Sequence, residues 1–220
     1  MKPKAKKHES LRSEVPAIVL STIALAATFI WFSGWGVTVG VDSIVGRNGV
    51  ANALSEGDPA AAADAFLRAY PVFMHPRCVN CHPAGDQPLQ GNEQIRPHAM
   101  NVKRGSDGMG KNGLWCSTCH QNENLPGEHM PPGAPGWELP PEDMPMVFEK
   151  ISPRELCEHF KDPAQNGGRN PAEVVEHVRT APLVLWGWSP GEGRTPVLMP
   201  HREFVRNMAE WADKGAACPK

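Results

Sequence analysis

Two short cysteine motifs constrain this chain more than any other feature. Residues 78–82 read CVNCH and residues 116–120 read CSTCH, which are two copies of the C-x-x-C-H pattern. This pattern is the attachment site of c-type haem: two thiols add across the vinyl groups of the porphyrin, and the histidine gives an imidazole nitrogen to iron. The sequence therefore predicts two covalently attached haem c groups. The attaching thiols are those of Cys78, Cys81, Cys116 and Cys119, and the proximal iron ligands are His82 and His120.

Zinc and disulfides are the competing uses of these four thiols. Two C-x-x-C pairs separated by 34 residues can form a four-thiolate zinc site, and thiols outside the cytoplasm can oxidise to disulfides. Each pair is followed at once by histidine, which a zinc ribbon does not require, and the region lacks the hairpin pattern of a ribbon. Haem is the favoured interpretation.

The spacing of the motifs predicts how the haems are arranged. Only 33 residues separate His82 from Cys116, too few to build an independent domain around each haem. The two haems are therefore expected to share one core and to lie close together. The chain also holds 21 Gly and 23 Pro, and residues 71–145 show almost no helical or strand periodicity, as expected where a cofactor fills the core.

The N-terminal segment predicts a membrane anchor. Residues 1–15 are rich in lysine, and residues 16–41 carry no charge over a length that is sufficient to span a bilayer. A cleaved signal peptide is the alternative, although its apolar core is normally shorter. The basic tail is expected in the cytoplasm, and residues 42–57 are expected to tether an extracytoplasmic (periplasmic) haem domain, residues 58–220, to the cell membrane.

The haem domain is predicted to be mostly α-helical, with long irregular Gly/Pro-rich loops and little or no β-sheet. Asp58 and Pro59 mark the start of a helix that Pro71 is expected to stop. Capping boxes predict helices from Ser152 to about Lys161 and from Asn170 to about Thr180. A last helix is expected from about His201 to Lys214. The two remaining cysteines, Cys157 and Cys218, most simply form a structural disulfide.

The sixth ligand of each iron determines whether the iron can bind small molecules. His98 and His129 are the leading candidates, because both lie in Gly/Pro-rich segments that can wrap around a porphyrin ring, and Met130 is a weaker one. The other candidates are His75, Met100, Met144, Met146 and Met199. The histidines interpreted as ordinary helix or tail residues are His8, His159, His177 and His201.

Three stretches of this sequence resemble a group of small exported dihaem c-type cytochromes. They are YPVFMHPRCVNCHPAGDQPLQG, CSTCHQNENLPGEHMPPGAPGWELPPEDMPM and LWGWSPGEGRTPVLMP, and the resemblance runs from about residue 70 to the end. Such sequences are often described as a subunit of isoquinoline 1-oxidoreductase. The resemblance implies a dihaem architecture and service as electron acceptor to a molybdenum hydroxylase carried on other chains.

Electron transfer is the function that these features predict. The chain is expected to act without catalysis of its own, as a subunit or carrier in a respiratory chain, between a dehydrogenase or quinol pathway and a terminal acceptor. Its partners would be redox proteins, among them membrane-bound oxidoreductase subunits. The formal net charge of −2 offers no basic surface for nucleic acid. The alternatives are a dihaem enzyme, peroxidase-like or reactive towards nitrogen oxides, and a gas or redox sensor. Both need an open iron.

Overall fold

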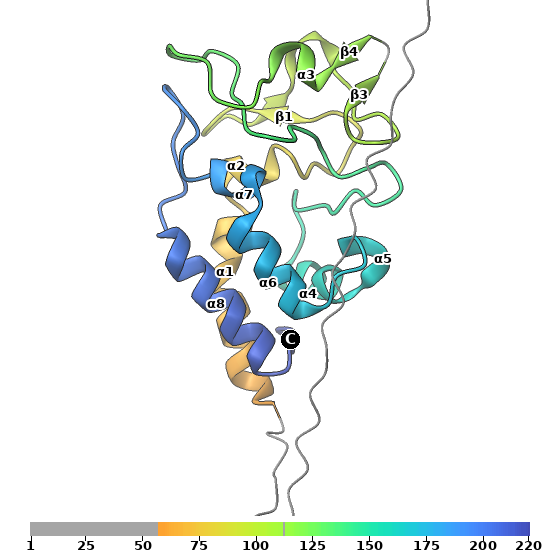
Figure 1. Ribbon diagram of the computed structural model, residues 1–220. Helices are drawn as coiled ribbons and strands as arrows, with labels where there is room; N and C mark the ends of the chain where they lie inside the picture. Colours follow the sequence, from red (N-terminus) through yellow and green to blue (C-terminus); the bar gives the residue numbers. More distant parts are fainter. Residues whose placement is uncertain (1–56, 112) are drawn as a thin grey trace, which may run out of the picture. The chain divides into compact units, whose positions relative to one another are not determined.

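The computed structural model describes residues 57–111 and 113–220, and the elements are named as in Figure 1. The predicted basic tail, the predicted anchor and all but the last residue of the predicted tether lie outside these residues. Of the helices within the described ranges, none has both the length and the apolar character needed to cross a membrane.

Four helices form a helical body around an aromatic core. They are α1 (Pro59–Phe73), α4 (Pro153–Lys161), α6 (Pro171–Thr180) and α8 (His201–Asp213). Helix α1 packs along α8, and α6 packs against α8 from another side (Figure 1). Rings from all but α6 contact one another in the interior, where Phe73 lies 4.9 Å from Phe160 and 5.2 Å from Phe204 between ring centroids. This apolar burial stabilises the body.

Helix α1 begins where the sequence predicts but ends later. The Asp58 side chain accepts a hydrogen bond from the Ala61 N–H at 3.0 Å. The prediction that Pro71 ends the helix is wrong, because α1 continues through Pro71 to Phe73. The Pro71 ring lies on the exposed side, whereas Val72 and Phe73 are each only 3% exposed. Burial of these two side chains holds the last turn helical despite the missing N–H.

The other predicted helix starts are confirmed. Ser152 and Glu155 form a capping box at α4, and Asn170 and Glu173 form another at α6. Helix α8 covers the predicted range to within one residue. Cys157 in α4 and Cys218 near the C-terminus form a disulfide, with Cα atoms 5.6 Å apart. This bond ties the C-terminal segment to the helical body.

A loop layer lies beyond the C-terminal end of α1 and is formed mainly by residues 83–149 (Figure 1). It contains two antiparallel ribbons, β1 (Leu89–Gln90) with β2 (Arg96–Pro97), and β3 (Gly110–Lys111) with β4 (Leu114–Trp115). The 3₁₀ turn η1 (Ala99–Asn101) follows β2. The regular β-structure of the described residues is thus confined to these four strands of two residues, close to the expectation of little or no sheet.

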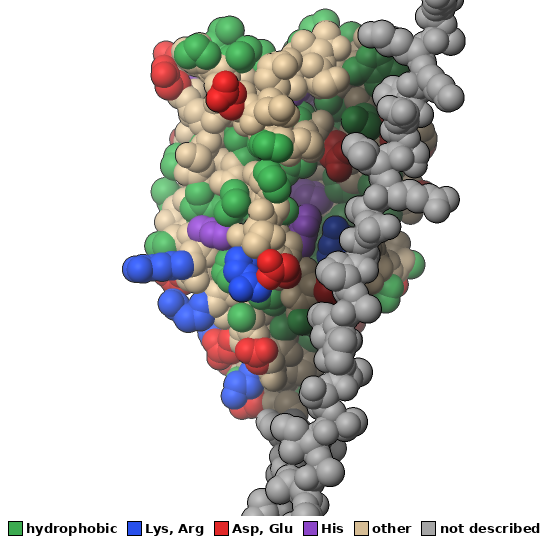
Figure 2. Space-filling model, in the orientation of Figure 1, with side chains coloured by type: hydrophobic (Ala, Val, Ile, Leu, Met, Phe, Trp, Pro, Cys, Tyr) green, Lys and Arg blue, Asp and Glu red, His purple; other side chains and the backbone are tan. Residues whose placement is uncertain are grey.

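Four short helices complete the described elements. They are α2 (Pro76–Val79), which follows α1, α3 (Cys116–Cys119) within the loop layer, α5 (Pro163–Asn166) beside α4, and α7 (Pro182–Trp186) after α6 (Figure 1). On the face drawn in Figure 2, Lys and Arg side chains gather over the helices, and hydrophobic side chains are spread over both the helices and the loop layer. The first cysteine motif begins in α2, between α1 and the loop layer, and the second begins in α3 within that layer.

Candidate haem sites

The first motif leaves the helical body at the end of α1. Cys78 lies in α2, and Cys81 and His82 follow it directly. The His82 Nδ1 atom lies 2.7 Å from the Met146 carbonyl oxygen, and the His82 ring stacks on the Phe148 ring at 3.9 Å and 12°. Because a carbonyl oxygen can only accept, Nδ1–H donates this bond and Nε2 keeps its lone pair. Burial lowers the pKa of His82 to about 4, which keeps the imidazole neutral.

The second motif repeats this arrangement within the loop layer. Cys116 and Cys119 lie in α3, and His120 follows the helix. The His120 Nδ1–H donates to the Pro132 carbonyl oxygen at 2.7 Å, and the ring stacks on Trp137 at 4.6 Å and 4°. Burial lowers the pKa of His120 as well. A hydrogen bond from Nδ1–H to a backbone carbonyl is a common means of orienting a metal-bound imidazole and increasing its basicity.

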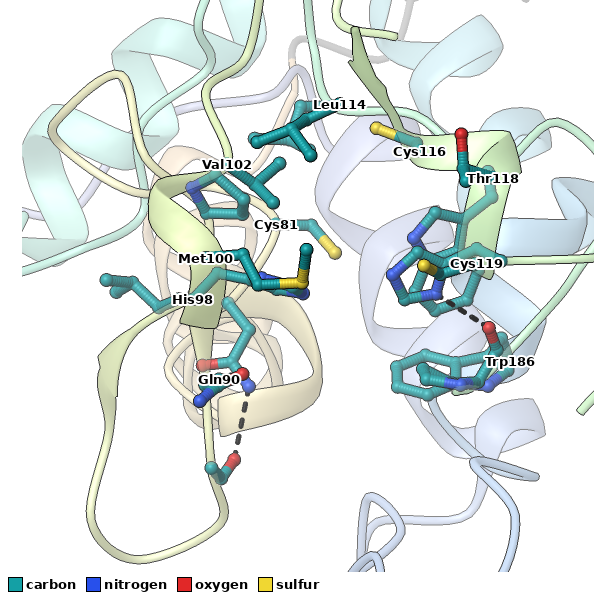
Figure 3. A pocket seen from close by; sticks show the side chains of 18 of the residues that line it. Cys81, Gln90, His98, Met100, Val102, Leu114, Cys116, Thr118, Cys119 and Trp186 are labelled. Carbon is teal, nitrogen blue, oxygen red and sulfur yellow. Dashed lines mark hydrogen bonds between the residues drawn. The ribbon is translucent and has the colours of Figure 1, made fainter. Parts of the chain in front are cut away.

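Each motif faces its own cavity. The first cavity has a volume of ≈ 270 Å³ and is lined by Cys78, Cys81 and His82 together with side chains of α6 and of the 137–148 segment. The second has a volume of ≈ 220 Å³ and is lined by all three motif residues of the second site. Figure 3 shows the second cavity, with Cys116 and Cys119 on one side and His98 and Met100 on the opposite side.

The two cavities adjoin one another. The residues that line both are Arg77, Cys81, Trp137, Leu139 and Trp186. Cys81 belongs to the first motif but also reaches into the second cavity (Figure 3). Trp137 stacks on His120 and meets the Trp186 ring edge to face, at 5.0 Å and 86°. One wall of side chains therefore separates the two cavities.

Among the predicted distal ligands, His98 lies in a cavity. The β1–β2 ribbon positions it, since the His98 N–H donates to the Pro88 carbonyl oxygen at 2.8 Å. The His98 Nδ1–H donates to the Ala99 carbonyl oxygen at 2.9 Å, which leaves Nε2 available. The His98 and His120 ring centroids are 6.1 Å apart across the second cavity. An imidazole nitrogen binds a transition metal at about 2 Å, so two imidazoles on opposite sides of one ion have centroids about 6 Å apart.

The structure brings neither His129 nor Met130 into either cavity. The His129 side chain is 71% exposed and lies 3.4 Å from the Glu128 carboxylate. Met130 is 42% exposed. His75 also lies outside both cavities, and its Nδ1 accepts a hydrogen bond from the Arg77 N–H at the start of α2. Of the predicted methionines, Met100 lines the second cavity, and Met144 and Met146 line the first.

One histidine of the first cavity was not among the predicted ligands. His177 of α6 lines this cavity together with Val174 and Val178 of the same helix. Sequence reasoning treated His177 as an ordinary helix residue. The available signal was its position three residues after one buried valine and one residue before another, which places it next to the buried face of the helix.

The thiols of the two motifs are suited to covalent attachment of haem. Cys78, Cys81, Cys116 and Cys119 form no disulfide. Within the described part of the chain, no three His, Cys, Asp or Glu side chains converge as a metal site. Largely apolar cavities with a thiol pair and a neutral imidazole fit haem c.

Comparisons with known proteins add no family. No protein-family model matches the chain, and no curated protein or solved structure matches it.

Proposed function

We propose that this chain is a dihaem c-type cytochrome that acts as an electron-transfer subunit or carrier. It would accept electrons from a dehydrogenase or quinol pathway and pass them to a terminal acceptor. The observation that carries this proposal is the repetition of one site: each C-x-x-C-H histidine donates Nδ1–H to a backbone carbonyl and faces a cavity. The two cavities share a wall.

Each part of the motif has a defined task in this proposal. Cys78 and Cys81 would attach the first haem, and Cys116 and Cys119 the second. His82 and His120 would bind the two irons through Nε2, oriented by the carbonyls of Met146 and Pro132. His98 would bind the second iron from the opposite side. The haems supply one-electron chemistry, and the protein supplies ligands, burial and position.

The shared wall supports electron transfer between the haems. Trp137 and Cys81 lie between the cavities, so the two centres would be separated by side chains of a single protein rather than by solvent. No diffusing carrier is then needed between them. The proposal includes an anchor at residues 16–41, with the N-terminus in the cytoplasm and the haem domain on the extracytoplasmic side. Such a tether raises the effective concentration of the cytochrome near membrane-bound partners.

One observation favours a second candidate function. None of the favoured distal ligands, His98, His129 and Met130, lines the first cavity, where Met144 and Met146 are the predicted candidates. If the first iron has no sixth ligand, it is open to peroxide or a nitrogen oxide, and the chain is a dihaem enzyme. The two functions therefore differ in whether carbon monoxide can bind the reduced protein.

The test is a spectroscopic count on the mature protein. The chain is expressed with the haem-attachment machinery and purified, and its absorbance is recorded oxidised, dithionite-reduced and reduced with carbon monoxide. A pyridine haemochrome assay counts the haems. Two haem c per chain and no response to carbon monoxide are expected. Fewer than two haems would contradict the dihaem assignment, and a carbon monoxide response would favour the enzyme.

A further inference from the structure

Helix α6 presents one face to the first cavity. Val174, His177 and Val178 all line it, and their spacing of three and four residues puts them on the same side of the helix. Val174 and Val178 are buried, at 2% and 4% exposure. The two buried valines therefore fix the orientation of α6, and His177, which is exposed to solvent, lines the cavity from the same side of the helix.

Two imidazoles line the first cavity, and the His177 side chain is still open to solvent there. Imidazole is the commonest metal ligand in proteins. Both rings line the same cavity, His82 from the motif and His177 from α6.

The methionines of this cavity are less suitable ligands. The Met146 carbonyl oxygen accepts the hydrogen bond of His82, which fixes the Met146 backbone on the His82 side of the cavity. The Met144 sulfur lies next to Gly167, the residue that follows α5. A Cβ atom built on Gly167 would lie 3.5 Å from this sulfur. Among the described residues that line this cavity, the only two histidines are His82 and His177.

We propose that His177 is the sixth ligand of the first haem iron, opposite His82. This inference rests on the proposed function, because it requires haem in the first cavity. With His98 opposite His120, both haems then have two histidine ligands. Both irons are closed to small ligands, and both reduction potentials lie below those of cytochromes in which a methionine is the sixth ligand.

His177→Ala tests this inference in the full-length haem protein. Two haems by pyridine haemochrome are expected, as in the wild type, but one of them becomes high-spin and binds carbon monoxide when reduced. Carbon monoxide should therefore perturb about half of the haem absorbance, and added imidazole should reverse the change. His129→Ala is the matched control, because His129 lies outside both cavities, and it should remain unresponsive.

The failures of the two proposals can be told apart. Wild-type protein without two haems would contradict the proposed function. Two haems with an unresponsive His177→Ala variant would overturn the ligand assignment alone, as would a carbon monoxide response in Met144→Ala. If His177→Ala does not fold, His177→Met decides: methionine ligation should raise one of the two potentials. Two unchanged potentials would overturn the assignment.

Discussion

The first cavity is enclosed by helices, whereas the second is enclosed mainly by loops. The first lies against the aromatic core, and its lining includes Phe73, Phe148, Phe160 and Phe204. The second is lined by two-residue strands and irregular segments, with Trp115 at 51% exposure and Met100 at 70%. The same five-residue motif and the same Nδ1–H to carbonyl bond are thus built into two different environments. In the proposed cytochrome the motif would determine how haem is held, and the surroundings would determine what its loss does to the fold.

The largest predicted effect is that of removing each haem in turn. A haem that fills its cavity buries apolar surface there, and its removal takes that burial away. The two cavities have similar volumes, ≈ 270 and ≈ 220 Å³. The volumes alone predict nearly equal losses, so any clear difference must come from the surroundings.

Cys78→Ala/Cys81→Ala is expected to unfold much of the domain, because its cavity is part of the helical core. Cys116→Ala/Cys119→Ala should lose the second haem. The loop layer is then expected to unfold locally, while the helical body keeps most of its stability. Thermal unfolding followed by far-ultraviolet circular dichroism, with a haem count, measures both. Equal losses of helical signal in the two variants would remove the distinction between the cavities.

The next prediction concerns a bond that belongs to the helical body alone. The Cys157–Cys218 disulfide closes a loop of 61 residues, and loops of this size gain about 4 kcal/mol from loop-closure entropy. Cys218→Ser is expected to lower the free energy of unfolding by about 2–4 kcal/mol while both haems and their spectra are retained. Denaturant titration measures the change, with dithiothreitol-treated wild type as control. A shift in the haem spectrum would mean that the disulfide also shapes a haem site.

The sequence predicted the local features of the molecule well. The attachment motifs and the starts of α4 and α6 are encoded within five residues, so no tertiary information is needed to find them. Contacts between distant segments were not predictable in this way. The Met146 carbonyl lies 64 residues from His82, and the direction of His177 depends on how α6 packs against the core. The wrong end of α1 has the same origin, because burial overrode the local preference of Pro71.

The smallest predicted effect is that of replacing each of the two aromatic rings that stack on the motif histidines. Phe148 stacks on His82, and Trp137 stacks on His120. Such a contact is worth about 0.5–1.5 kcal/mol beyond its buried area, so replacing the ring with leucine should leave the protein folded but loosen the imidazole beneath it. Phe148→Leu is expected to alter the electron paramagnetic resonance signal and potential of the first haem only.

Trp137→Leu should act mainly on the second haem, with a weaker effect on the first, because Trp137 lines both cavities whereas Phe148 lines one. The oxidised spectrum of each variant, in which every low-spin haem has its own signal, provides the measurement, and a redox titration follows the potentials. If Trp137→Leu alters neither haem, the wall between the cavities has no influence on the iron centres. If it alters both haems equally, the two sites are coupled through that wall more strongly than their separate surroundings imply. The contrast between a helical and a loop environment then applies to stability rather than to redox properties.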